Sequence, residues 1–228
     1  MKLAIAGLNG RMGSFLYRVL SKRSNYEITY GIDMKIDYKS IPLYKKIRED
    51  LTDILIDFTE ASFSYKLIKE ALNKRIKVIS GTTGFTKSQI EELKSLSEKL
   101  HISLILVPNY ALGASILYHE AANLLELFDS YDIIESHNIN KRDIPSGTAK
   151  EYARLLNISE DKIQALRLNE VIATHEIILN NPGERLIIKH EILSRDAFLK
   201  GFLQALDYIS DDEYHEIVGL KDFYDVFH

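Results

Sequence analysis

The first half of the chain alternates between short apolar segments and segments with helical spacing. Apolar runs typical of buried strands occur at Lys2–Ala6, Tyr26–Asp33, Asp53–Thr59, Lys77–Gly84 and Ile102–Asn109. Segments typical of helices lie between them, at Met12–Lys22, at Ala61–Arg75, and from a capping box at Thr86 and Gln89 to about Leu100. Strands separated by helices predict a parallel sheet with right-handed crossovers. Residues 34–49 give no pattern that we can place.

The second half follows a different pattern. Its expected elements are a helix, a strand, a turn with a second helix, a strand-rich segment and a last helix. The first helix covers about Ala114–Phe128, the strand Tyr131–His137, the strand-rich segment Ile163–Arg195 with a hairpin at Asn181-Pro182-Gly183, and the last helix Asp196 to about Ile209. Long helical and strand-rich stretches in this order indicate an α+β arrangement.

These patterns predict two domains. We expect an N-terminal Rossmann-like α/β domain with a parallel sheet, made of residues 1–108 plus 196–228. We expect a C-terminal α+β domain in residues 109–195.

Composition narrows the class of protein. Hydrophobic residues at 46% and charged residues at 27% are ordinary for a globular protein of 228 residues. A formal net charge of −4 argues against a nucleic-acid binder, so local positive charge must hold any anionic ligand. The absence of cysteine excludes disulfides and thiolate–metal sites, and we expect no metal. There is no signal peptide and no long apolar run, so the expectation is a cytoplasmic protein without membrane contact.

A glycine-rich turn follows the first predicted strand. Gly7, Gly10 and Gly13 have the spacing G-x-x-G-x-x-G, a variant of the dinucleotide fingerprint. Glycines permit close approach of the backbone, and the helix N-terminus offers N–H groups to a pyrophosphate, which Arg11 can also reach. The alternative is a turn that serves only strand–helix packing. Asp33 ends the second strand, where an acidic residue binds the adenosine ribose. This position favours NADH slightly over NADPH, although Lys35 is near.

Three more polar segments end predicted strands. They are "DFT" at residues 57–59, "GTTG" at residues 81–84 and "VPNYA" at residues 107–111. Ligands bind outside the carboxyl ends of the strands in an open α/β sheet. We therefore expect Phe58, Gly81, Thr82 and Thr83 beside the nicotinamide and its ribose. An ordinary turn is the better explanation of any one segment taken singly, whereas three at the same sheet edge favour a ligand site.

A cluster of cations precedes a predicted helix N-terminus in the stretch "ESHNINKRDIPSGTA". His137 ends a strand, Lys141 follows four residues later, and Pro145 interrupts any helix through this region. Ser146 or Thr148 can cap the next helix, whose free N–H groups can bind a carboxylate. Lys141 is a candidate proton donor. A solvated basic loop with a capped helix is the alternative.

The motifs "GLNGRMG", "DFT", "SGTTGF", "VPNYALG" and "ESHNINKRDIPSGTA" occur in this order. Together they resemble the signature series of the 4-hydroxy-tetrahydrodipicolinate reductase (dihydrodipicolinate reductase) family, over nearly the whole chain. The resemblance implies a Rossmann-like domain, an open mixed sheet that supports a homotetramer, and NAD(P)H-dependent reduction of a cyclic dicarboxylate in lysine and diaminopimelate biosynthesis.

The resemblance also assigns residues to roles. The cofactor-binding residues are Gly7, Leu8, Asn9, Gly10, Arg11, Met12, Asp33, Phe58, Gly81, Thr82, Thr83, Val107, Pro108, Asn109 and Tyr110. His137 is the acid/base residue and Lys141 the proton donor. The substrate-binding residues are Asn138, Ser146, Gly147, Thr148 and Arg195. Asn138 departs from the family pattern, which has a second histidine there. Another Rossmann oxidoreductase and a non-catalytic NADH-binding sensor are the competing interpretations.

Overall fold

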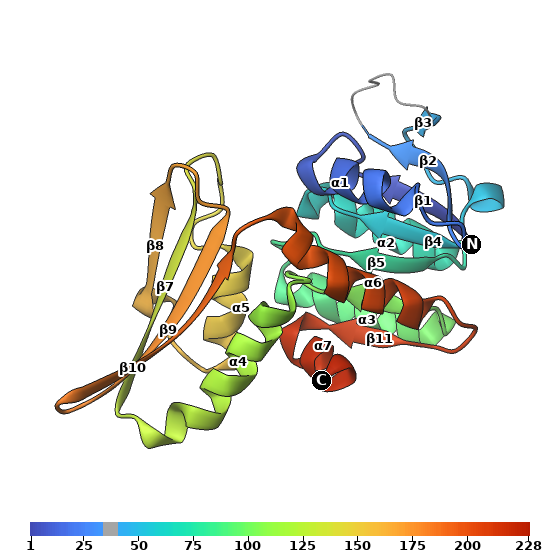
Figure 1. The fold of residues 1–228 in the computed structure, drawn as a ribbon. Helices are drawn as coiled ribbons and strands as arrows, with labels where there is room; N and C mark the ends of the chain where they lie inside the picture. The colour runs from blue at the N-terminus through green and yellow to red at the C-terminus, as the bar shows by residue number, and fades with distance from the viewer. Residues whose placement is uncertain (34–40) are drawn as a thin grey trace. The chain divides into compact units, whose positions relative to one another are not determined.

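The computed structural model describes residues 1–33 and 41–228, and these form two compact units. The first unit contains Met1–Val107 and Leu203–Val218, and the second contains Pro108–Phe202 and Gly219–His228. Figure 1 follows the chain through both, and helix α6 (Leu199–Ile209) carries it from the second unit back to the first. Residues 34–40, which include Lys35 and begin the segment that the sequence patterns could not place, lie outside the described residues.

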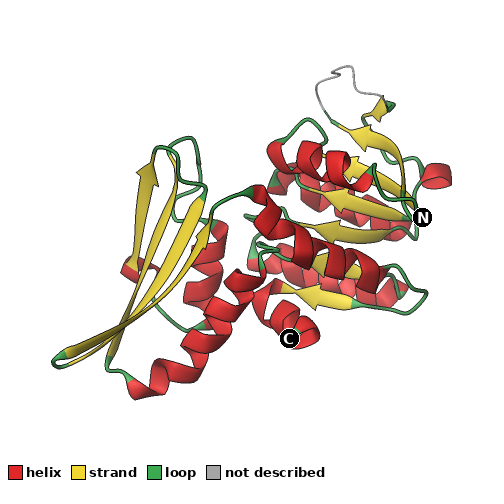
Figure 2. Ribbon diagram, viewed as in Figure 1, coloured by secondary structure: helices red, strands yellow, loops and turns green. Residues whose placement is uncertain are grey.

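The first unit is built on a parallel sheet with the order β11-β6-β5-β4-β1-β2-β3. Its strands are β1 (Lys2–Ala6), β2 (Glu27–Ile32), β3 (Leu43–Tyr44), β4 (Ile54–Asp57), β5 (Lys77–Ser80), β6 (Leu104–Leu106) and β11 (Glu216–Val218). Its helices are α1 (Arg11–Leu20), α2 (Ala61–Asn73) and α3 (Lys87–Leu100), with the short η1 (Glu49–Leu51). Figure 2 shows helices on both faces of this sheet. The α/β class is confirmed.

The register of the parallel strands lines up their carboxyl ends. Ala6 of β1 pairs with Ile32 on one side and with Asp57 on the other. Asp57 pairs in turn with Ser80, the last residue of β5. The chain runs outward from β1 to β3 and then returns to β4 on the other side of β1. This reversal makes the carboxyl ends of β1 and β4 the place where a doubly wound sheet binds ligands.

The second unit is built on a mixed sheet with the order β10-β9-β7-β8, in which only β7 and β8 run parallel. Its strands are β7 (Ser130–Asn138), β8 (Ile163–Leu168), β9 (Ala173–Asn181) and β10 (Glu184–Ile192). Its helices are α4 (Leu112–Leu124), α5 (Gly147–Leu155), α7 (Gly219–Phe227), η2 (Leu125–Leu127), η3 (Glu160–Lys162) and η4 (Arg195–Phe198). This is the expected open mixed sheet.

Helices α4 and α5 cover one face of this mixed sheet (Figure 1). The buried Tyr152 of α5 donates its hydroxyl to the Ala114 carbonyl of α4 at 2.9 Å, and its ring contacts the ring of His175 on β9. Side chains alternate between faces along a strand. The odd-numbered residues of β7 and β9 therefore point toward the helices, and the even-numbered ones point to the opposite face.

The structure refines several expected boundaries. The strands expected at residues 77–84 and 102–109 end at Ser80 and Leu106, where the chain turns out of the sheet. The capping box is confirmed, because Thr86 and Gln89 each accept the other's backbone N–H. The sequence interpretation missed β3 and β11, whose segments are too short to give a periodic pattern, and it also missed α7, which is as long as α5 and amphipathic.

The division into units also differs from the expected domain ranges. Contacts group residues 196–202 and 219–228 with the second unit rather than with the first. Phe202 and Phe223 pack edge-on against Tyr110, with ring centroids 5.5 and 5.8 Å away. This aromatic cluster draws the last helix into the second unit. Over the described residues, no helix combines the length and the apolar character needed to cross a membrane.

Gly7→Ala is expected to destabilise the first unit more than Gly84→Ala does. Both glycines have positive φ, +75° and +93°, so alanine at either costs about 1–2 kcal/mol in backbone strain. A Cβ at Gly7 would also lie 2.4 Å from the Phe58 carbonyl oxygen, whereas the nearest atom at Gly84 is 3.7 Å away. Crowding of this kind adds roughly 1–3 kcal/mol. Urea unfolding of the two variants checks the difference, and equal losses would contradict it.

Candidate active site

The turn between β1 and α1 brings backbone against backbone. The Gly7 N–H donates to the Ile32 carbonyl at 2.9 Å. A Cβ at Gly13 would lie only 2.1 Å from the Gly7 carbonyl oxygen, and one at Gly10 would lie 3.0 Å from the same atom. Helix α1 therefore lies closer to the end of β1 than it could if a residue with a Cβ replaced Gly10 or Gly13. Such a cradle fits the pyrophosphate of a dinucleotide.

The N-terminus of α1 carries no neutralising side chain. Its N-cap residue, Gly10, makes no side-chain capping bond, and the first turn contains no acidic residue. Arg11 is the first helical residue and is exposed. The positive end of the helix dipole and the guanidinium are thus both suited to a phosphate.

Asp33 follows β2 and is tied to the glycine turn. Its Oδ2 accepts the backbone N–H of Asn9 at 2.9 Å. The expected ribose-binding carboxylate therefore also holds the turn in place. The side chain of Leu8 is buried and lies so close to Gly31 that a Cβ there would be 2.4 Å from it. Leu8 can therefore meet a cofactor only through its backbone.

Asp57, the last residue of β4, organises the neighbouring strand ends. Its carboxylate is fully buried and accepts four hydroxyl hydrogen bonds. The donors are Thr59 at 2.6 Å, Ser80 at 2.6 Å, Thr82 at 2.8 Å and Ser64 of α2. Hydrogen bonds to a charged group contribute about 1.5–3 kcal/mol each, which offsets the cost of burying the carboxylate. Asp57 thus fixes the "DFT" and "GTTG" segments against each other.

This network limits how the expected nicotinamide residues can act. The Thr82 hydroxyl donates to Asp57 and accepts the Thr59 N–H at 3.0 Å, so it points into the protein. The ring of Phe58 lies on Gly81, where a Cβ would be 2.1 Å from a ring carbon. Thr82 therefore offers its carbonyl rather than its hydroxyl, and Gly81 is required for the placement of Phe58. Thr83 is half-buried in the same turn.

The "VPNYA" segment is largely buried. Val107 donates its N–H to the Ser80 carbonyl at 3.1 Å, and Asn109 accepts the Ala111 N–H at 3.0 Å. The side chains of Val107 and Tyr110 are 1% and 2% exposed. Only the backbone of these two residues is therefore suited to a cofactor contact, while Pro108 is half-buried.

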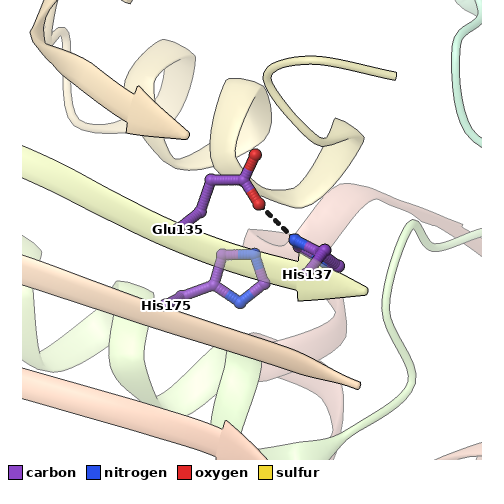
Figure 3. Close-up of side chains that lie close together, drawn as sticks. All are labelled: Glu135, His137 and His175. Carbon is purple, nitrogen blue, oxygen red and sulfur yellow. Dashed lines mark hydrogen bonds and ion pairs between the residues drawn. The ribbon is translucent and has the colours of Figure 1, made fainter. Parts of the chain in front are cut away.

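In the second unit, a buried carboxylate holds the expected acid/base residue. Glu135 on β7 is 0% exposed, and its Oε2 is hydrogen-bonded to Nδ1 of His137, as Figure 3 shows. Its Oε1 accepts from Arg167 Nη1 at 3.0 Å and from the Ser146 N–H at 3.1 Å. Burial raises the pKa of Glu135, but His137 and Arg167 outweigh it and hold the pKa below its ordinary value. His137 Nδ1 is thus committed to Glu135, which leaves Nε2 for proton exchange.

Arg167 on β8 also fixes the loop that carries Lys141. It donates to the carbonyl of Lys141 at 3.3 Å and to the carbonyl of Asp143 at 2.5 Å. The turn before this loop is closed by Asn138, whose carbonyl accepts the Lys141 N–H at 2.9 Å and whose Oδ1 accepts from Asn140. The oxygen of Asn138, an expected substrate ligand, is therefore used within the turn.

Lys141 and the N-terminus of α5 meet at one carboxylate. Asp143 Oδ1 lies 2.8 Å from Lys141 Nζ, and Asp143 Oδ2 accepts the Gly147 N–H at 3.3 Å. Burial raises the pKa of Asp143, but Lys141 outweighs it and lowers the pKa below its usual value. Ser146 caps the helix by accepting the Ala149 N–H at 3.2 Å, and Thr148 is buried in the first turn.

The expected substrate residues are thus brought together, with one exception. His137, Lys141, Ser146 and Gly147 are linked through Glu135, Arg167 and Asp143. Arg195 begins η4, and among the described residues no hydrogen bond or ion pair joins it to this cluster.

Sequence reasoning did not single out Asp57, Glu135, Arg167, Asp143 or His175. Glu135 and Asp143 could have been found from the sequence. Glu135 is two residues before His137 on a predicted strand, so the two side chains share a face. Asp143 lies four residues before Gly147, within reach of the helix start. Arg167 gave no signal, because it is 32 residues from Glu135 in the sequence.

Glu135, His137 and His175 have the donor types of a metal site, and their ligand atoms lie within 4.8 Å of one another. Figure 3 shows His175 beside the other two. Burial lowers the pKa of His175 to about 3, so its ring is neutral at neutral pH. The Arg167 guanidinium already neutralises Glu135 and would repel a divalent cation. The charges around this cluster therefore favour a proton-bearing site over a metal site.

Comparison with known proteins covers almost the whole chain. Residues 1–110 match the family model described as dihydrodipicolinate reductase, N-terminus, and residues 113–224 match the model for the C-terminus. A 4-hydroxy-tetrahydrodipicolinate reductase from Dictyoglomus turgidum is 31% identical over 90% of this chain and 91% of its own. One from Methanococcus aeolicus is 29% identical over 97% of each chain.

Solved structures agree on the fold. A dipicolinate-bound dihydrodipicolinate reductase from Paenisporosarcina sp. TG-14 superposes with a TM-score of 0.76, at 23% identity over 96% of this chain and 98% of that one. GenD2 from gentamicin A biosynthesis, in complex with NAD, has a TM-score of 0.64 at 10% identity over 92% of this chain and 85% of its own. Both structural likenesses concern the fold alone, whereas the sequence matches are specific. The chain belongs to the dihydrodipicolinate reductase family of NAD(P)H-dependent oxidoreductases.

Proposed function

We propose that the chain reduces 4-hydroxy-tetrahydrodipicolinate, a cyclic dicarboxylate, to tetrahydrodipicolinate in lysine and diaminopimelate biosynthesis. Family membership supports the reaction, and one observation supports the site. A cation, Lys141 Nζ, and a helix N–H, that of Gly147, converge on a single carboxylate, Asp143. The same ammonium and N–H groups are suited to bind a carboxylate of the substrate.

The first unit holds the cofactor in this proposal. The turn Gly7–Met12 and the exposed Arg11 bind the pyrophosphate, and Asp33 binds the adenosine ribose. Phe58, the Gly81–Thr83 turn and the backbone of Val107–Tyr110 surround the nicotinamide. The carboxylate of Asp33 accepts ribose hydroxyls and repels an added phosphate, which favours NADH over NADPH. Bound NADH or NADPH supplies the hydride, and the expected hinges are the points where the chain passes from one unit to the other, after Val107, Phe202 and Val218.

The second unit binds and protonates the substrate. The N-terminus of α5, from Ser146 to Thr148, holds one carboxylate together with Lys141, and Arg195 contacts the same anion. The 4-hydroxyl group leaves the ring as water, and hydride then adds to a carbon conjugated with the ring imine. The resulting enamine needs one proton, and the Lys141 ammonium donates it. His137 exchanges protons through Nε2, because Glu135 fixes its other nitrogen. The side-chain amide nitrogen of Asn138, Nδ2, donates a hydrogen bond to the substrate without adding charge.

The mixed sheet supports assembly into a homotetramer. Leu166, Leu168 and Ile187 lie on the face opposite to α4 and α5 and are 46%, 43% and 49% exposed. A second copy of this sheet would cover these apolar side chains. A cytoplasmic location follows from dependence on NADH or NADPH, which the cytoplasm regenerates.

A coupled assay tests the reaction. With substrate generated freshly by the pathway synthase, both reductants are expected to be oxidised, with a higher kcat/KM for NADH. The physical reason is that the carboxylate of Asp33, beside the glycine turn, accepts hydrogen bonds from the ribose hydroxyls of NADH and repels the added phosphate of NADPH. Oxidation of NADH and of NADPH is followed separately at 340 nm, roughly the absorbance maximum of the reduced ring. A chain that binds NADH but gives no turnover would be a sensor rather than a reductase.

Lys141→Ala is expected to lower kcat by about 100-fold or more, because it removes the proton donor. NADH binding should be nearly unchanged, since Lys141 is not one of the residues assigned to the cofactor. Lys150→Ala is the matched control, because Lys150 is an exposed lysine on α5, the helix that follows the loop of Lys141. Steady-state kinetics and NADH fluorescence titration measure both quantities. Turnover within a few-fold of the wild type would rule out the proton-donor role.

The stability of the second unit should fall in acid through Glu135. Its pKa is lowered below the ordinary 4.5 in the folded state, so its contribution is present above pH 4.5 and is lost as the pH falls through the folded pKa. Glu135→Gln should cost roughly 3 kcal/mol at pH 7, because it leaves the largely buried guanidinium of Arg167 without its carboxylate partner. Its unfolding free energy should then depend less on pH than that of the wild type.

Urea unfolding at pH 7, 5 and 4 measures this dependence. Glu160→Gln is the charge-matched control, because Glu160 is exposed in η3. The control variant should keep the wild-type slope. A wild-type slope in Glu135→Gln would show that this carboxylate is not stabilised by its partners.

A further inference from the structure

Asp143 occupies the place that the proposed function reserves for the substrate. Its two carboxylate oxygens contact Lys141 Nζ at 2.8 Å and the Gly147 N–H at 3.3 Å. Lys141 and Gly147 are the groups to which we assign a substrate carboxylate. A single carboxylate bridges them, and this carboxylate belongs to the chain itself.

The two parts of Asp143 are held very differently. Its backbone carbonyl accepts a hydrogen bond from Arg167 Nη2 at 2.5 Å, and Arg167 is in turn paired with the buried Glu135. Its side chain is 44% exposed, whereas that of Lys141 is 25% exposed. The main chain is therefore fixed, while rotation about the side-chain bonds can carry the carboxylate into solvent at little cost.

We propose that Asp143 is an internal competitor for the substrate carboxylate. In the free enzyme it neutralises Lys141 and satisfies the first N–H of α5. When the dicarboxylate binds, the side chain of Asp143 rotates away and a substrate carboxylate takes over both contacts. This inference rests on the proposed function, because it concerns the same anion site.

This exchange has two consequences for binding. The Lys141 cation and the Gly147 N–H always have an anion beside them. The two groups are therefore already ordered when the substrate binds. The substrate gains only the difference between its own contacts and those of Asp143. Substrate affinity is thereby weaker than the same site would give without the aspartate, which also eases release of the product.

The experiment measures the binding of dipicolinate, pyridine-2,6-dicarboxylate, to the NADH-bound protein by isothermal titration calorimetry. Asp143→Asn keeps the shape of the side chain and removes its charge. We expect the Kd for dipicolinate to fall about tenfold in this variant, because the charged group that competes for Lys141 and Gly147 has been removed. Asp143→Ala should give a change in the same direction.

A second arm uses the partner of Asp143. In a Lys141→Met background, Asp143→Asn should change the Kd less than twofold, because the ion pair that competes is already absent. Glu160→Gln is the control for net charge. Glu160 precedes β8, whose first residue pairs with Ile133, so it lies at the opposite end of the strands from the loop that follows Asn138. This variant should bind dipicolinate as the wild type does.

Each outcome decides between the alternatives. An unchanged or weaker Kd in Asp143→Asn and Asp143→Ala, with NADH affinity and urea midpoint as in the wild type, overturns the competitor role. It would show instead that the aspartate only positions Lys141. If the wild-type protein with NADH binds no dipicolinate and reduces no substrate, the proposed function itself fails and this inference fails with it.

Discussion

The ion pair between Glu135 and Arg167 holds the second unit's site together. Each partner fixes a different part of it. Glu135 is hydrogen-bonded to His137 on its own strand and accepts the N–H of Ser146 at the start of α5. Arg167 donates hydrogen bonds to the carbonyls of Lys141 and Asp143, which lie in the loop between β7 and α5. Removing one partner from a buried pair costs about 3–5 kcal/mol, since the other charge is left uncompensated. The loop has no regular structure of its own, so its geometry depends on this pair.

A similar arrangement organises the first unit. Asp57 ends β4 as a fully buried carboxylate, and hydroxyl groups from the loop after β4, from α2, from β5 and from the loop after β5 converge on it. In both units a strand thus delivers an anion to the end of a sheet, and that anion orders the segments proposed to touch ligand. Neither carboxylate is exposed enough to be a ligand-binding group. Both are better described as positioning residues, whose effect on chemistry is transmitted through Thr82, His137 and Ser146.

The sequence predicted the fold class because alternation and glycine spacing are local properties. The strand starting at Lys2, the turn at Gly7 and the capping box at Thr86 each depend on neighbours within a few residues. Elements made by distant contacts were not predictable in this way. The strand β11 is only three residues long and exists because it pairs with β6, more than a hundred residues earlier. The helix α7 is drawn to the second unit by Phe223 against Tyr110, which no local pattern reveals.

The same distinction separates the predicted part of the site from the part that was missed. His137, Lys141 and Ser146 lie in one short stretch, so a motif could identify them. Arg167 and His175 reach that stretch only because β8 and β9 flank β7 in the sheet. The departure at Asn138 takes on a structural meaning in this setting. Its oxygen closes the turn before Lys141, a task for which an amide suits better than an imidazole, because its carbonyl oxygen accepts from the N–H of Asn140 two residues on. The positive charge that a histidine would add at this position is absent, so the proposed exchange between Asp143 and a substrate carboxylate at Lys141 gains weight.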